Sequence, residues 1–381
     1  MSEQKQVKIV LLTGYLGAGK TTIVNHILQN AEGMRVAVIV NDIGEINVDV
    51  SLIKDGGYAK GENVIPLTNG CLCCTLSDDL ARQLGDLADT EEFDYIIIEA
   101  SGMCEPIPIT YNISAFCDQN QQVAKCSRLN LDNIVAVVDC ARMFEEFHNG
   151  RDLLANDIEE DDIESLLIQQ IEFCSTLILN KCDLVTSEQL KELKVLVRSL
   201  QKDAVIVESV NGDIPMSELM NTNRFDFDKA YASAAWVDAM EHPEEHEDPE
   251  VLEYEITTFV YRRRKPFDLD KLNQFVASWP KSIIRVKGSI WAAQDPETSY
   301  VFEQVGKQVQ FYKNGLFYAS LPEDERETLF DEKPELRSEW DEELGDRQTK
   351  LCFIGRHMNR NEIEAGLDSC LTEYEPIEFD Y

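Results

Sequence analysis

One short motif constrains the fold more than any other feature of the sequence. Residues 14–22 read Gly-Tyr-Leu-Gly-Ala-Gly-Lys-Thr-Thr. The apolar residues 7–12 precede this motif, and residues 23–28 follow it with the apolar spacing of a helix. A glycine-rich turn between a strand and a helix is typical of a phosphate-binding loop. We therefore predict such a loop here rather than a turn that binds nothing.

The residue types of the loop explain how it would hold a nucleotide. Glycines lack a Cβ, so successive backbone N–H groups can point at phosphate oxygens near the positive end of the following helix. Lys20 is expected to reach the β- and γ-phosphates and to act in catalysis, and the Thr21 hydroxyl is a ligand for Mg²⁺. The residues predicted to bind the phosphates are Gly14, Gly17, Ala18, Gly19, Lys20, Thr21 and Thr22.

The charge of the chain limits its partners. The sequence has 381 residues, enough for two or three domains, and a formal net charge of −36. Such a charge repels nucleic acid and anionic lipid, so we expect neither as a partner. Without a membrane-spanning run or a secretory signal, the chain is expected to be cytoplasmic. The eleven cysteines lack a disulfide-scaffold spacing, so most should be reduced core thiols.

Residues 1–225 alternate short β-branched runs with helical patterns. This alternation predicts an α/β fold, namely a P-loop NTPase domain with a mostly parallel sheet and flanking helices. Ligands of such sheets bind at the carboxyl ends of the strands, so the residues just after each strand are site candidates. The predicted strands are 8–12, 36–40, 64–67, 95–98, 134–138, 177–179 and 204–207.

Two of these strand ends carry candidate catalytic acids. After 36–40, Asp42 is expected to position Mg²⁺ or an attacking water and Glu45 to join a metal site, unless both are solvated loop carboxylates. After 95–98, Glu99 stands where a Walker B acid contacts Mg²⁺ through water, and the Gly102 N–H can sense the γ-phosphate. An ordinary strand-end acid is the alternative for Glu99. Pro106 is expected to stop the next turn from becoming a helix.

Three thiols follow the strand predicted at 64–67. Cys71, Cys73 and Cys74 lie within four residues, just before a helical pattern at 75–87. Thiolate suits Zn²⁺, Cu(I) or Co²⁺, and a helix N-terminus lowers the pKa of a thiol. We predict a metal site made by all three, or by Cys71 with one of the adjacent pair plus a carboxylate or water. Redox chemistry and structural packing are the alternatives.

The strand predicted at 177–179 leads into Asn180-Lys181-Cys182-Asp183. A carboxylate at the position of Asp183 can accept hydrogen bonds from the N1–H and N2–H₂ groups of guanine, and adenine has no matching donor pair. We therefore predict GTP as the nucleotide, with Asn180, Lys181 and Asp183 in its site. Ser209, after the last predicted strand, is expected to close over the base.

The composition changes after residue 225. Residues 238–255 contain nine acidic residues and no basic ones, so an exposed acidic linker is expected at 226–250, where His242 and His246 are too few for a strong metal site. Residues 251–381 then predict a smaller α+β domain. Its basic run 262–265 is expected to balance the acidic surroundings, and an anion-binding site is the alternative. Its predicted elements are strands at 251–261, 283–292, 308–317 and up to 358, a helix at 268–279 capped by Asp268, and a terminal helix at 361–371.

Together these motifs resemble the CobW family of GTPases, which are metal chaperones and metallocentre-assembly factors. The resemblance spans residues 5–225, and the C-terminal half is similar to the family's smaller second domain. The motifs that carry it are the phosphate loop, Asn41-Asp42-x-Gly44-Glu45, Gly70-Cys71-x-Cys73-Cys74, Glu99-x-Ser101-Gly102 with Pro106, and Asn180-x-x-Asp183.

The resemblance implies a nucleotide-controlled switch. GTP and Mg²⁺ would order the cysteine segment so that Zn²⁺ or Co²⁺ is held tightly, and slow hydrolysis to GDP would release the ion to a metal-requiring client protein. Self-association into a homodimer is compatible with these features. A phosphotransferase acting on a small substrate and a redox-responsive interaction protein with a disulfide at 71–74 are the competing functions.

Overall fold

The structure is a computed structural model. Contacts divide the chain into two compact units, Met1–Ala235 and Trp236–Tyr381, which are treated separately below. In the part of the chain that the structure describes, no helix has both the length and the apolarity needed to cross a membrane. The described residues are 6–31, 33–40, 64–66, 77–102, 104, 106–123, 128–148, 161–227, 229, 256–280, 282–305, 308–332 and 334–374.

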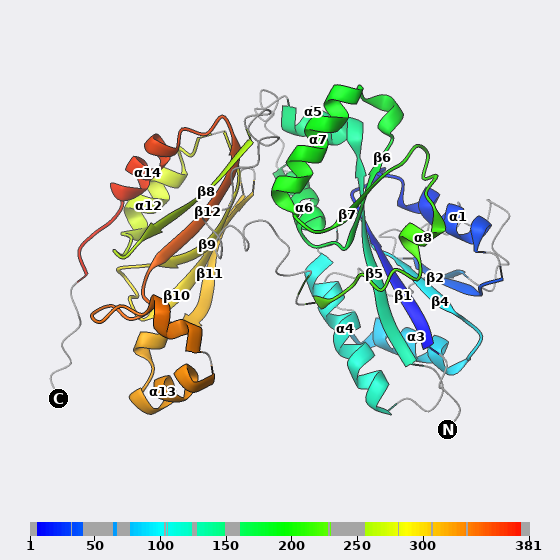
Figure 1. Cartoon of the computed structure of the whole chain (residues 1–381), viewed down its shortest axis with the longest axis horizontal. Helices are drawn as coiled ribbons and strands as arrows, with labels where there is room; N and C mark the ends of the chain where they lie inside the picture. Colours follow the sequence, from blue (N-terminus) through cyan, green and yellow to red (C-terminus); the bar gives the residue numbers. More distant parts are fainter. Residues whose placement is uncertain are drawn as a thin grey trace. The chain divides into compact units, whose positions relative to one another are not determined.

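The N-terminal unit is built on a seven-stranded sheet with the order β3-β2-β4-β1-β5-β6-β7 (Figure 1). All of its strand pairs are parallel, and β2, β4 and β6 are buried along their whole length, as strands covered on both faces must be. The predicted α/β class is therefore confirmed. The strands are β1 Gln6–Thr13, β2 Val36–Val40, β3 Val64–Pro66, β4 Tyr95–Glu99, β5 Arg128–Asp139, β6 Thr176–Asn180 and β7 Val205–Glu208.

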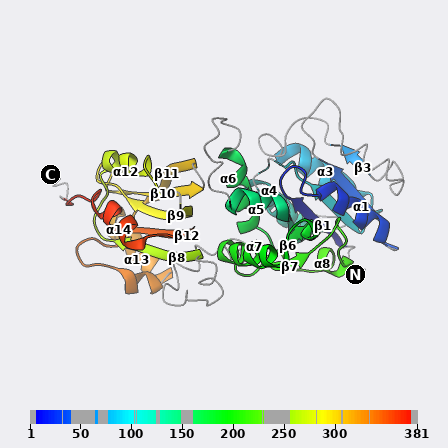
Figure 2. The ribbon, with the colours of Figure 1, turned by 90° about the horizontal axis from the view of Figure 1, so that it is seen from above.

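Helices cover this sheet (Figures 1 and 2). Ile23 and Ile27 of α1 and Leu219 of α8 pack on one face, against a set of strand side chains that includes Val10 and Val38. Helix α4 packs against β5 and α3. The helices of this unit are α1 Lys20–Asn30, α3 Ser77–Asp89, α4 Pro106–Val123, α5 Cys140–His148, α6 Asp161–Glu172, the 3-10 turn η1 Cys182–Leu184, α7 Ser187–Leu200 and α8 Met216–Leu219.

The prediction that Pro106 prevents a helix is wrong. Helix α4 begins at Pro106 and continues to Val123. The first residue of a helix has no intrahelical acceptor for its N–H, so proline loses nothing there, and its fixed φ already suits the helix. Proline therefore sets the start of α4 instead of blocking it.

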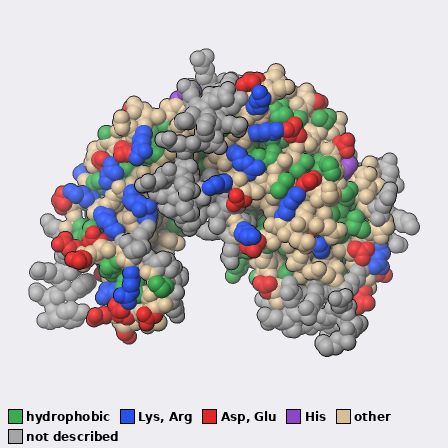
Figure 3. Space-filling model, in the orientation of Figure 1, with side chains coloured by type: hydrophobic (Ala, Val, Ile, Leu, Met, Phe, Trp, Pro, Cys, Tyr) green, Lys and Arg blue, Asp and Glu red, His purple; other side chains and the backbone are tan. Residues whose placement is uncertain are grey.

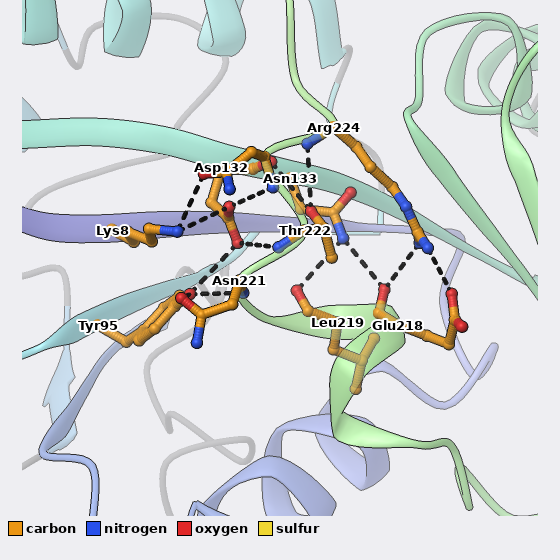
Figure 4. Close-up of polar contacts among 10 residues, drawn as sticks. Lys8, Tyr95, Asp132, Asn133, Glu218, Leu219, Asn221, Thr222 and Arg224 are labelled. Carbon is orange, nitrogen blue, oxygen red and sulfur yellow. Dashed lines mark hydrogen bonds and ion pairs between the residues drawn. The ribbon is translucent and has the colours of Figure 1, made fainter.

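A bulge in β5 buries the carboxylate of Asp132 in a polar network (Figure 4). The register between β1 and β5 skips Asp132, which is the extra residue of the bulge. The side chain is fully buried, and it accepts hydrogen bonds from the backbone N–H groups of Asn223 at 2.7 Å and Thr222 at 3.2 Å. Lys8 Nζ lies 3.6 Å from the same carboxylate. Asp132 thus fastens the segment after α8 to the centre of the sheet.

Tyr95 of β4 strengthens this attachment. Its single hydroxyl hydrogen has two acceptors, Asn221 Oδ1 at 2.9 Å and Asp132 Oδ2 at 3.4 Å, and its oxygen accepts the Asn221 N–H at 2.6 Å. Burial, followed by the nearby Asp132 carboxylate, raises the pKa of Tyr95 above its ordinary value. The phenol therefore stays a neutral donor.

We expect Asp132→Asn to lower the free energy of unfolding by about 1–3 kcal/mol, because one carboxylate oxygen becomes an NH₂ facing backbone N–H donors. Urea unfolding followed by circular dichroism measures the change. Asp213→Asn is the matched control, since the Asp213 side chain is exposed in the same unit. Equal stability of the two variants would contradict a structural role for Asp132.

The C-terminal unit contains a five-stranded sheet with the order β11-β10-β9-β12-β8, in which every strand pair is antiparallel. Leu272 of α12 and Ile363 and Leu367 of α14 pack on one face of it. The predicted α+β class is confirmed, and Asp268 caps α12 through the N–H groups of Asp270 and Lys271. The elements are β8 Ile256–Arg263, α12 Leu269–Val276, β9 Ile283–Trp291, β10 Thr298–Val305, β11 Gln308–Leu316, η2 Tyr318–Ser320, α13 Glu323–Glu332, η3 Pro334–Glu339, β12 Thr349–Arg356 and α14 Arg360–Asp368.

Many charged side chains described in this unit form ion pairs with one another. Arg263 contacts Asp368 at 2.8 Å and Glu364 at 3.2 Å, and Lys265 contacts Glu373 at 2.5 Å. The hydrogen bond from Arg263 holds the pKa of Asp368 below its ordinary value. Figure 3 shows Asp and Glu side chains gathered over α13, with Lys and Arg above them. Two of the four residues of the basic run, Arg263 and Lys265, thus pair with acids of the same unit.

Candidate functional site

The phosphate-binding loop lies between β1 and α1, where the sequence predicts it. Gly19 is the N-cap of α1 with φ 108°, and no side chain caps this helix end. The Ala18 N–H donates to Tyr15 O at 3.1 Å, which closes the turn. The positive end of α1 therefore faces the loop without a competing side-chain acceptor, which is the electrostatic condition for binding a phosphate.

Lys20 lies folded into the loop. Its side chain is buried, and Nζ donates to Gly14 O at 2.6 Å and Tyr15 O at 3.3 Å. Loop carbonyls therefore hold the ammonium where phosphate oxygens would meet it.

Thr21, in the first turn of α1, meets Glu99, the last residue of β4. Leu12 of β1 is in register with Glu99 of β4. The loop that follows β1 and the residue that ends β4 therefore lie at the same edge of the sheet. Thr21 Oγ1 donates to Glu99 Oε1 at 2.9 Å, and Glu99 is 2 % exposed. A hydroxyl and a buried carboxylate are hard oxygen donors, so this pair fits Mg²⁺. The structure brings these two predicted site residues together.

Gly102 lies against the tip of the phosphate loop. A Cβ at this position would lie 2.6 Å from Leu16 N and 2.8 Å from Leu16 Cγ. Only glycine permits so close an approach, which places the backbone after β4 beside the loop. Thr22 is exposed on the first turn of α1.

Asn180 joins the phosphate loop to the last strands of the sheet. Its Nδ2 donates to Ala18 O at 2.9 Å, and its Oδ1 accepts the Gly212 N–H at 3.2 Å. Ser209 Oγ donates to Asp213 O at 3.3 Å and its backbone bonds to Leu179 and Cys182. Asn180 and Ser209 are both buried. The phosphate loop, the end of β6 and the loop after β7 are thus joined by hydrogen bonds.

Lys181 and Asp183 begin the turn beyond β6. Lys181 has a left-handed backbone with φ 59°, and its Nζ pairs with Asp139 Oδ2 at 2.6 Å. Asp183 is exposed in η1, where its carboxylate is open to a ligand. The turn therefore carries Lys181, whose charge is paired with Asp139, close to Asp183, whose carboxylate is exposed.

Two residues beside the site, Asp139 and Arg142, were not predicted from the sequence. Asp139 ends β5 and also caps α5 by accepting the N–H groups of Ala141 and Arg142. Its place at a strand end was the available signal. The Arg142 guanidinium lies 4.1 Å from the centroid of the Tyr15 ring, a contact for which the sequence offered no signal.

Five predicted site residues lie outside the described residues. Among the residues that the structure does describe, no group of three or more His, Cys, Asp or Glu side chains is placed to hold a metal ion. The metal site therefore stays a prediction, as do the roles of these side chains. The five residues are Asp42, Glu45, Cys71, Cys73 and Cys74.

Sequence comparison decides the family. Residues 8–208 match the family model described as "CobW/HypB/UreG, nucleotide-binding domain", and residues 256–371 match "Cobalamin synthesis protein cobW C-terminal domain". The chain belongs to the CobW family. The resemblance predicted from the motifs is therefore confirmed, and the phosphate loop lies in a CobW nucleotide-binding domain.

Two curated relatives are similar to most of the chain. The "Zinc-regulated GTPase metalloprotein activator 1" of Dictyostelium discoideum is 34% identical over 96% of this CobW chain and 80% of its own. The "Zinc chaperone YjiA" of Escherichia coli K12 is 27% identical over 94% of this chain and 97% of its own. The crystal structure of Zn(II)-bound YjiA GTPase is 21% identical over 97% of this chain and 100% of its own, with a TM-score of 0.42.

We expect Gly19→Ala to weaken nucleotide binding to this CobW domain at least about tenfold, since the cost of one lost hydrogen bond adds to backbone strain. A Cβ at φ 108° would lie 2.4 Å from Asn180 Nδ2 and push that amide off Ala18 O. Titration with a fluorescent GDP measures the effect.

Gly33→Ala is the matched control for this variant. Gly33 also has a positive φ, 75°, yet a Cβ there would meet nothing within 4 Å. It shares the backbone strain and lacks the clash with Asn180. Wild-type affinity in Gly19→Ala, or equal losses in both variants, would contradict the role of the Asn180 contact.

Proposed function

We propose that this CobW protein is a GTP-hydrolysing metallochaperone that binds Zn²⁺ through Cys71, Cys73 and Cys74 and delivers it to a client protein under nucleotide control. The observation that carries the proposal is the pair of hydrogen bonds that the Asn180 amide makes, donating to Ala18 O and accepting the Gly212 N–H. They fix the phosphate loop beside the turn that bears Asp183, so phosphate binding and base selection belong to one site.

Guanine selection is assigned to Asp183. Its exposed carboxylate can accept both the N1–H and N2–H₂ donors of guanine, and it lies three residues beyond Asn180, the last residue of β6. The protein is a GTPase of the CobW family, in line with the name of its Dictyostelium relative. Lys181 and Ser209 are proposed to flank the base.

Phosphate handling is assigned to Lys20, Thr21 and Glu99. Lys20 is proposed to exchange the carbonyls of Gly14 and Tyr15 for β- and γ-phosphate oxygens. The Thr21 hydroxyl and Glu99 carboxylate would hold Mg²⁺, which when bound neutralises charge on those phosphates. Glu99 and Asp42 are the residues proposed to orient the attacking water, and the Gly102 N–H is proposed to contact the γ-phosphate.

The metal cargo is assigned to the three clustered thiols. Thiolate ligands suit Zn²⁺ and Co²⁺ alike, with Glu45 as a further candidate ligand. The names of the Dictyostelium and Escherichia coli relatives favour zinc. Zinc is therefore the ion proposed first and cobalt the second.

The sheet supports communication between the two sites. Pro66 at the end of β3 is in register with Val40, and Val40 is in register with Glu99. Strands lie about 4.8 Å apart, so Pro66 lies roughly 10 Å across the sheet from Glu99. Cys71 follows Pro66 by five residues, a length that can span up to about 17 Å. A segment of this length permits the thiols to approach the edge that bears Glu99, and we propose that nucleotide and ion favour one arrangement of shared loops.

Asp183→Asn is expected to weaken GDP binding about a hundredfold, the cost of two hydrogen bonds to a charged acceptor. The asparagine amide can donate to the 2-carbonyl of xanthine, so xanthosine diphosphate should bind the variant better than GDP. Asp203→Asn is the control, because Asp203 is exposed in the same unit. Unchanged guanine preference would contradict the assignment. Hydrolysis that requires an added acceptor molecule would instead indicate a phosphotransferase.

Zinc affinity is expected to rise about tenfold when Mg²⁺ and a non-hydrolysable GTP analogue replace GDP, within the usual range of coupling between sites. Competition with a chromophoric chelator measures this on the full chain. Replacing Cys71, Cys73 or Cys74 by alanine should reduce zinc affinity and the coupling together. Cys117→Ser, a buried cysteine on α4, is the control. Equal zinc affinity in both nucleotide states would refute nucleotide-controlled delivery.

A further inference from the structure

Two cysteines meet beside the guanine-recognition turn. Asp139, the last residue of β5, is in register with Asn180, the last residue of β6, so the next residues leave adjacent strands at the same edge. Cys140 Sγ and Cys182 Sγ lie 3.8 Å apart, in direct contact. The Asp139–Lys181 ion pair lies one residue earlier on each segment. The two segments are thus fastened by a charge pair and a thiol pair.

We propose that Cys140 and Cys182 form a reversible disulfide when the protein meets a peroxide, and that this bond weakens guanine nucleotide binding. The second half of the proposal rests on the guanine site proposed above. The competing interpretation is a packed thiol pair with no chemistry. The two interpretations differ in what an oxidant does to the pair.

The two thiols differ in access. Cys140 is fully buried at the start of α5, whereas Cys182 is partly exposed in η1. Burial, followed by the neighbouring Cys182, raises the pKa of Cys140 well above its ordinary value. Cys182 is therefore the sulfur that a dissolved oxidant reaches first, and Cys140 is the sulfur held beside it.

The chemistry balances with one peroxide per disulfide. The Cys182 sulfur attacks a peroxide oxygen, the O–O bond breaks, and Cys182 becomes a sulfenic acid as water leaves. The Cys140 sulfur then attacks the Cys182 sulfur, the S–O bond breaks, and the hydroxyl leaves as water with the proton of the Cys140 thiol. The two thiols lose two electrons, and the peroxide gains them. A dithiol reductant reverses the bond by exchange.

The disulfide has to move the recognition turn. The sulfurs must close from 3.8 Å to about 2.0 Å. Cys140 is fixed by its burial and by the Asp139 cap of α5, so most of the movement falls on Cys182. Cys182 holds the turn by its N–H to Ser209 O at 3.1 Å and its Sγ to Leu179 O at 3.0 Å. Displacing it shifts Asp183, the next residue, away from the base position.

The test oxidises the full chain with hydrogen peroxide and compares it with the reduced chain. Peptide mapping should detect a Cys140–Cys182 cross-link that dithiothreitol removes. GDP titration should show affinity lowered at least about tenfold on oxidation of the wild-type chain, the cost of one strong hydrogen bond to Asp183. Cys140→Ser should remove the cross-link and most of the loss of affinity. Oxidation of Cys71, Cys73 or Cys74 would affect GDP affinity equally in the wild-type and Cys140→Ser chains, so it does not account for a difference between them.

Cys174→Ser is the matched control, a buried cysteine of the same unit whose pKa burial raises to about 12. It should keep both the cross-link and the loss of affinity. Absence of the cross-link in the wild-type chain would overturn the proposal, and so would a cross-link that leaves GDP affinity unchanged. Protection of the two thiols that a chelator removes, but dithiothreitol does not, would instead identify a metal pair and also overturn it. A reduced chain that fails to bind GDP would contradict the proposed function without affecting the mapping of the disulfide.

Discussion

The side-chain amide of Asn180 is the contact on which the nucleotide site depends. Through Ala18 O and the Gly212 N–H it joins the phosphate loop at the centre of the sheet to the loop beyond β7. Gly19 must be glycine because the same amide occupies the space of its missing Cβ. A buried amide with both ends engaged can hold only one arrangement of these loops, since leaving either end unbonded in the interior is costly.

The parallel sheet supplies the other half of the site. Glu99 reaches Thr21 because β4 and β1 are neighbours and end at the same level. Val40, at the end of β2, is in register both with Glu99 and with Pro66, the last residue of β3. The three clustered thiols follow Pro66 in the sequence. A nucleotide bound at one end of this row and an ion bound at the other would act on loops that share one sheet edge. This shared edge is the physical basis of the coupling that we propose between nucleotide and metal.

Polar networks outside the site fix the parts that carry it. Asp132, placed inward by a bulge, secures the segment after α8 to the strands that also bear the phosphate loop and Glu99. At the carboxyl end of β5, the strand that bears Asp132, Asp139 both caps α5 and pairs with Lys181. The turn at 181–183, to which we assign guanine recognition, is therefore held by neighbours on β5 and α5 and not only by its own strand. Its cysteine, Cys182, contacts Cys140 for the same reason.

The sequence by itself determined the strands of the N-terminal unit and the place of the phosphate loop, because apolar runs and glycine spacing are local properties of a chain. It misjudged Pro106, since proline is compatible with both a break and a helix start. It also missed the exposed acidic helix α13 and the strand β10. Tertiary structure alone decided which distant residues meet, such as Asn180 with Ala18, Thr21 with Glu99, and Cys140 with Cys182. These contacts depend on strand order and register, which long-range packing sets and local sequence does not encode.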